Sequence, residues 1–167
     1  IDHDGRMYLY REIYMTRRMV EDHAKQIMDC VAPLDNDTNR RVWSEPKPST
    51  VICDHDAEDR ATFEKHTGLP TNAAKKAVST GIEATQMRFR VAGDGKPRIF
   101  FLKSALVERD QALEAAGRPT KTADELLVYI WNEGKDQPVK ENDHGSDAMR
   151  YGVANEDLNG QYRVRWL

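Results

Sequence analysis

Apolar and polar residues alternate in some segments of the chain and recur at helical spacing in others. Alternation over residues 6–14 (RMYLYREIY) predicts a strand. Over residues 17–32 the apolar positions recur every three or four residues, which predicts an amphipathic helix capped by Thr16. Short apolar runs at 49–53 and 97–102 predict buried strands, and strands of this kind are usually central and parallel.

The segments between these strands are typical of helices. A helix that begins after Asp54 is expected to close at Gly68, because glycine is favoured just past a helix end. Thr122 and Glu125 have the spacing of a capping box, with Leu126, Leu127, Ile130 and Trp131 on one face of the helix that follows. Further helices are expected at residues 80–90, with Ile82, Thr85 and Phe89 inward, at 104–116, and from about residue 143.

Strands that alternate with helices predict an α/β layered domain. In such sheets, sites form at the carboxyl ends of the strands, and Asp54 stands at the end of the 49–53 run. Asp4-Gly5 near the start has the pattern of a hairpin turn, which implies a further strand before it. The sequence is therefore expected to be a fragment of a longer protein.

Composition limits the classes of function without choosing one. The chain has 167 residues, enough for one ordinary domain, and a net charge of −3. That balance does not indicate a nucleic-acid-binding protein, although a local basic face is compatible with it. No apolar run approaches the length of a membrane helix, no signal peptide is visible, and Cys30 and Cys53 lie in apolar segments, as buried free thiols of a reducing cytoplasm would.

Two acidic clusters are candidates for metal chemistry. Asp54 can be a metal ligand or general base, or it can cap the helix that follows. Asp147 lies in the first turn of the last helix, which Asp143 could cap, and His144 could orient water or lie in solvent. Two Mg²⁺ ions about 4 Å apart, held by carboxylates from distant parts of a chain, are what phosphodiester hydrolysis uses.

Basic residues near these elements could hold phosphates, or could be solvated surface charges. The candidates for DNA binding are Lys75, Lys76, Arg88, Lys140 and Arg150.

The run NDHGSDAMRY resembles the C-terminal signature of the large terminase subunits of tailed bacteriophages, roughly DH, two residues, DA, one residue, RY. The match covers Asp143, His144, Asp147, Ala148, Arg150 and Tyr151. Other segments resemble the family in the expected order: the run that ends in Asp54, the segment AAKKAVSTGIEA, the strand PRIFFL and the DGRMYLYREIY hairpin.

The resemblance implies an RNase H-like nuclease domain over residues 1–154, without its N-terminal strands, and a tail at 155–167. Such a domain cuts concatemeric double-stranded DNA with two Mg²⁺ or Mn²⁺ ions, in the cytoplasm of a bacterial host, for a phage or prophage. Carried over, Asp54 and Asp147 are metal-binding catalytic residues, Asp143 is a further catalytic acid and His144 is accessory.

The same resemblance implies partner proteins and a reduced activity of this chain by itself. The ATPase domain, the small terminase subunit and the portal would be partners, and no membrane would be involved. No GxxxxGK[ST] loop is present, and the strand that carries the first acid of the family is missing, so the fragment is expected to be weakly active or inactive. Three alternatives remain: another RNase H-like nuclease such as a junction resolvase, a non-catalytic domain that docks on the portal or on DNA, or a structural α/β domain whose acids only cap helices.

Overall fold

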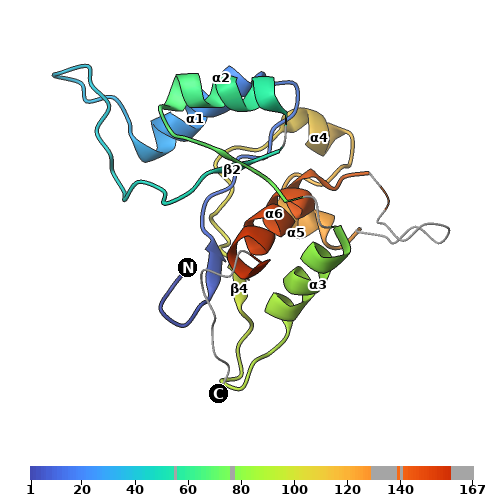
Figure 1. Cartoon of the computed structure of the whole chain (residues 1–167). Coiled ribbons are helices and arrows are strands. Elements are labelled where there is room, and N and C mark those ends of the chain that lie inside the picture. Colours follow the sequence, from blue (N-terminus) through green and yellow to red (C-terminus); the bar gives the residue numbers. More distant parts are fainter. Residues whose placement is uncertain (55, 76–77, 129–138, 140, 159–167) are drawn as a thin grey trace. The chain divides into compact units, whose positions relative to one another are not determined.

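The computed structural model describes residues 1–54, 56–75, 78–128, 139 and 141–158. It confirms a mixed α/β architecture, with short parallel strands and helices along the chain (Figure 1). The chain forms two compact units. The first unit combines Ile1–Thr16 with Lys75–Leu167, and the second is the intervening segment Arg17–Ala74.

The sheet of the first unit pairs β1 (Met7–Leu9) with β4 (Ile99–Phe101) in parallel. The rings of Tyr8 and Phe100, which lie opposite each other in the register, stack with their centroids 5.3 Å apart. Both strands fall where the apolar pattern predicts them. β1 is shorter than expected because its partner β4 ends at Phe101. Beyond Leu9, the described residues add an isolated bridge between Glu12 and Leu106.

Helices α3 (Val78–Phe89) and α6 (His144–Leu158) pack against each other in the first unit. Of the residues expected to face inward, Thr85 is buried and Ile82 is half-buried, but Phe89 is 40% exposed, and the other buried residues of α3 are Gly81 and Arg88. Glycine faces α6 because the side chain of Arg150 lies against it: a Cβ on Gly81 would come within 3.0 Å of the Arg150 Cγ. α6 ends at Leu158, beyond the domain end predicted at residue 154.

Two further helices of the first unit are much shorter than the pattern predicts. α4 (Gln111–Ala115) begins late because Asp110 caps it, accepting hydrogen bonds from the Ala112 and Leu113 amides. The Thr16 amide and hydroxyl donate to the same carboxylate, and with the Leu113 and Ala112 amides they lower its pKa to about 2. α5 (Thr122–Glu125) ends before Leu127, which is 85% exposed, and Ile130 and Trp131 lie outside the described residues.

The second unit holds α1 (Val20–Val31), which packs on α2 (Ala57–Thr67). α2 ends at Gly68 as predicted, with φ of 69°, the left-handed conformation that glycine adopts at least cost. β2 (Ile52–Cys53) pairs in parallel with β3 (Asn72–Ala73). Thr16 does not cap α1, because the N-cap is Met19 and the Thr16 hydroxyl is bonded to Asp110.

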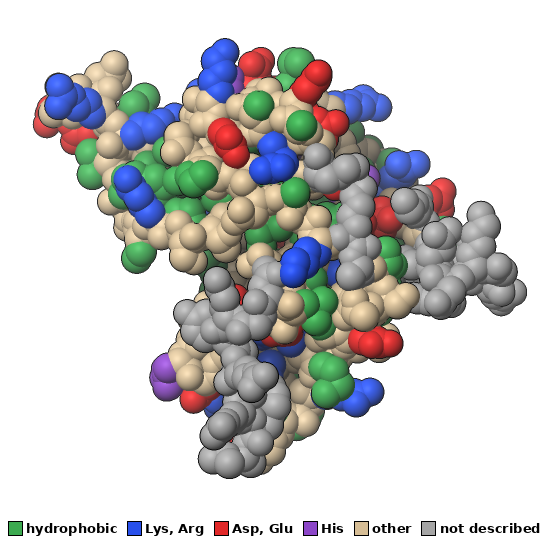
Figure 2. Space-filling model, in the orientation of Figure 1, with side chains coloured by type: hydrophobic (Ala, Val, Ile, Leu, Met, Phe, Trp, Pro, Cys, Tyr) green, Lys and Arg blue, Asp and Glu red, His purple; other side chains and the backbone are tan. Residues whose placement is uncertain are grey.

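Charged side chains of both signs are interspersed on the face shown in Figure 2.

Cys30 and Cys53 are half-buried free thiols, and burial raises the pKa of Cys53. Across the part of the chain that the structure describes, no helix is both long enough and apolar enough to cross a membrane.

Candidate active site at the start of the last helix

The first turn of α6 is positioned by a buried carboxylate from α5. Glu125, which is fully buried, accepts hydrogen bonds from the Gly145 amide at 3.0 Å and from the Ser146 amide at 2.6 Å. A negative side chain here satisfies two helix-terminal amides and complements the helix dipole. Glu125 therefore takes the capping role that the sequence pattern gave to Asp143, and it does not complete a capping box in its own helix.

Tyr14 and Glu12 complete this buried arrangement. The Tyr14 hydroxyl donates to Glu125 Oε1, and burial, followed by this hydrogen bond and the charge of Glu125, raises the Tyr14 pKa. Glu12 Oε1 accepts from the Thr122 amide at 2.7 Å and from its hydroxyl at 2.5 Å. The charges of Glu12 and Asp143 also raise the Tyr14 pKa, so these acidic groups act on one phenol.

Close approach of α5 to α6 explains the glycine in the DHGSDA run. A Cβ on Gly145 would overlap the Thr122 Oγ1 and would lie 3.1 Å from the Thr122 Cα. Since Thr122 is bonded to Glu12, it has little freedom to move away. A side chain at position 145 would therefore separate the two helices.

Asp147 is held in place from its own helix. Its Oδ1 accepts from Arg150 Nε at 3.2 Å and from Arg150 Nη2 at 2.8 Å, and its amide donates to the Asp143 carbonyl at 2.7 Å. Arg150 is only 5% exposed; burial alone would lower its pKa, but the bonds to Asp147 raise it. Asp143 and Asp147 lie four residues apart at the start of this helix, and both remain partly exposed.

Asp54 directly follows β2 and is exposed, as predicted for the carboxyl end of a parallel strand. The alternative that Asp54 caps the next helix is wrong. The cap is Asp56, whose Oδ1 accepts from the Glu58 amide at 2.9 Å and the Asp59 amide at 3.0 Å. Asp54 belongs to the second unit and Asp147 to the first, so the convergence of the two acids stays a prediction.

The carboxylates of Asp143 and Asp147 are of the kind that binds a hard divalent cation. Carboxylate oxygens are the ligands that Mg²⁺ prefers, and one or two of them with water commonly suffice. Asp143 and Asp147 each offer such oxygens. Within the described ranges no three His, Cys, Asp or Glu side chains are grouped closely enough to hold a metal ion.

The candidate DNA-binding residues fall into three groups. Lys75 is exposed, while Lys76 and Lys140 lie outside the described residues. Arg88 and Arg150 are buried, where Arg88 bonds both carboxylate oxygens of Asp157 and Arg150 bonds Asp147, and their role in DNA binding stays a prediction. In this conformation neither guanidinium is open to a DNA phosphate. His144 is exposed at the first position of α6, where it could reach water.

Sequence reasoning missed Glu12, Tyr14 and Glu125 as residues that build the site. Glu12 and Tyr14 lie in an alternating run that predicts a strand, and Glu125 has the spacing of a local cap. Only tertiary pairing brings them to the start of α6. Comparison with models of protein families, with curated proteins and with solved structures finds no match for the chain.

Proposed function

We propose that this chain belongs to the RNase H-like nuclease domain of a bacteriophage large terminase, which in the intact protein hydrolyses double-stranded DNA with Mg²⁺ or Mn²⁺. The observation that carries the proposal is the first turn of α6. There the DH and DA pairs of the motif become two carboxylates one turn apart, and the arginine of RY fixes the orientation of the second. A motif that only capped a helix would not need this arrangement, because Glu125 already caps α6.

The roles of the residues follow from these positions. Asp147 and Asp54 would hold the ions, with Asp143 as a further acidic ligand and His144 as a residue that orients water. When bound, the ions supply an activated water and stabilise the leaving oxygen of the phosphodiester. Arg150 keeps the Asp147 carboxylate in one orientation, so that the ligand is in place before an ion arrives.

The support from the second unit is the position of Asp54. It lies at the carboxyl end of a parallel strand, where sites form in α/β folds, and the adjacent helix is capped by another residue. In the same proposal the ATPase domain, the small terminase subunit and the portal are partners, and the bacterial cytoplasm is the place of action.

Isothermal titration calorimetry with Mn²⁺ tests the proposal directly. Saturable binding is expected, weakened about tenfold or more by Asp147→Asn and by Asp54→Asn, since each removes an ionic ligand. Asp37→Asn, at an exposed aspartate of the second unit, is the matched control and should leave binding unchanged. Binding unaffected by both site variants would refute the metal site.

Plasmid nicking with Mn²⁺ gives an independent measurement of activity. Any cleavage should disappear in Asp147→Asn and persist in Asp37→Asn. A preference for branched over linear DNA would indicate a junction resolvase in place of a terminase nuclease.

A further inference from the structure

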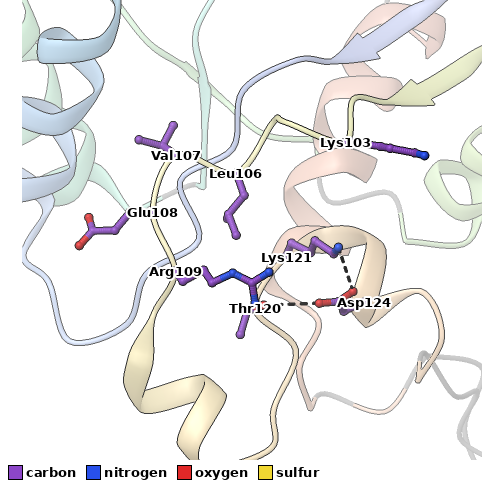
Figure 3. Close-up of a pocket in the computed structure, with 8 residues that line it drawn as sticks. All are labelled: Lys103, Leu106, Val107, Glu108, Arg109, Thr120, Lys121 and Asp124. Carbon is purple, nitrogen blue, oxygen red and sulfur yellow. Dashed lines mark hydrogen bonds and ion pairs between the residues drawn. The ribbon is translucent and has the colours of Figure 1, made fainter.

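Three cationic side chains line a cavity in the first unit. The cavity has a volume of about 260 Å³, and Lys103, Arg109 and Lys121 contribute to its walls (Figure 3). Two carboxylates, Glu108 and Asp124, also line it. These three cations stand against two carboxylates in the lining, and a third carboxylate, that of Glu114, pairs with Arg109 from outside it.

Glu12 holds two walls of this cavity in register. Its amide donates to the Ala105 carbonyl at 2.7 Å, and its carbonyl accepts from the Val107 amide at 2.9 Å, which fixes the wall that carries Leu106. Its carboxylate accepts from the amide and the hydroxyl of Thr122, next to Lys121 on the opposite wall. A rigid lining of this kind lowers the cost of ordering a site around a ligand.

Arg109 projects from an equally fixed backbone. Its neighbour Asp110 is buried and accepts two hydrogen bonds from Thr16 and two from the first turn of α4. Figure 3 shows the Arg109 side chain extending toward Thr120 and Lys121.

The ion pairs that these cations make are weak enough to exchange for a stronger ligand. Arg109 is paired with Glu114 at 3.2 Å, and Lys121 with Asp124 at 3.5 Å, and all four side chains are well exposed. Exposed pairs of this kind contribute about 0–1 kcal/mol. A phosphate group offers more acceptor oxygens and a geometry that arginine binds through two parallel hydrogen bonds.

We propose that this cavity binds a phosphate of the DNA backbone beside the candidate active site, an inference that rests on the proposed function for the identity of its ligand. The link to the active site is short. Lys121 and Thr120 precede α5, and the last residue of that helix, Glu125, caps the helix that carries Asp147. DNA held in the cavity would thus be positioned by the same element that positions the acids.

Fluorescence anisotropy with labelled duplex DNA in EDTA tests this inference without cleavage. Lys103→Gln, Arg109→Gln and Lys121→Gln should each weaken binding about threefold to tenfold at low salt, and each lost phosphate contact should reduce the salt slope by up to about 0.9. The triple variant should lose most of its affinity. Lys96→Gln is the matched control, because Lys96 is exposed and precedes β4 whereas Lys103 follows it.

Wild-type affinity in the triple variant would overturn the inference. A second arm measures the rise in melting temperature caused by inorganic phosphate. If the triple variant loses that rise but binds DNA normally, the cavity is a site for free phosphate and the inference also fails.

If DNA binding is lost in the triple variant while wild-type protein binds no Mn²⁺, the cavity inference stands and the catalytic proposal falls. If wild-type protein binds Mn²⁺ and the triple variant binds DNA normally, the catalytic proposal stands and the cavity inference falls.

Discussion

Replacing Glu125 by alanine should destabilise the first unit more than any other single change at the candidate site. The substitution removes the acceptor for three donors: the Tyr14 hydroxyl and the amides of Gly145 and Ser146. A buried donor left without a partner costs about 1–3 kcal/mol. Because water can enter the space that is created, the three costs do not add fully, and we expect a loss of about 3–5 kcal/mol, a large share of the roughly 5–15 kcal/mol that a domain has.

Urea denaturation followed by far-ultraviolet circular dichroism measures this loss. With a slope of about 1–3 kcal/mol per molar urea, the midpoint should fall by roughly 1–5 M. Glu125→Gln keeps the shape and one acceptor, so its effect should be smaller than that of alanine. Glu114→Ala is the control, since Glu114 is exposed and forms a surface ion pair with Arg109, and it should cost under about 1 kcal/mol. A loss below about 1 kcal/mol in Glu125→Ala would refute the capping role.

Three further predictions follow from contacts in the same unit. Gly145→Ala should cost at least about 2 kcal/mol in urea denaturation because its Cβ would strike Thr122, whereas Gly93→Ala, with nothing within 4 Å, should be nearly neutral; equal effects would contradict the close packing. The pKa of Asp110 is about 2, below its ordinary value, so the contribution of its carboxylate to stability is present above about pH 4 and is lost as pH falls toward 2. Asp110→Asn should therefore flatten the acid part of the curve of unfolding free energy against pH, and an unchanged curve would disprove the linkage. The raised Tyr14 pKa has the opposite consequence, since its contribution is complete below about pH 10 and lost above it, and Tyr14→Phe should reduce the fall in alkaline stability seen by the same denaturation assay.

Local signals predicted the elements that depend on local chemistry. The end of α2 at Gly68 follows from residues within one turn of that boundary. The positions of β2 and β4 were predicted from short apolar runs, which are also a local signal. In these places the pattern of the sequence and the packing of the chain favour the same conformation.

Interactions between distant segments decided what the pattern could not. Residues 104–116 and 122–131 have helical periodicity, yet α4 begins only after Asp110, which also bonds Thr16, and α5 ends at Glu125, which bonds the start of α6. α3 buries Arg88 and leaves Phe89 40% exposed, since Asp157 offers the arginine a partner within the unit. The capping residues also differ from those predicted. Asp56 caps α2 in place of Asp54, and Glu125 caps α6 in place of Asp143.

The parallel pairing of β1 with β4 has a consequence for synthesis on the ribosome. Met7 pairs with Ile99, so β1 is synthesised before β4 and stays unpaired while the ribosome makes the second unit. Residues 17–74 are contiguous and can collapse early, whereas the surrounding unit must close a long loop before its strands meet. Slow, vectorial folding of the first unit is therefore expected, with the unpaired β1 edge as the surface most exposed to aggregation in the meantime.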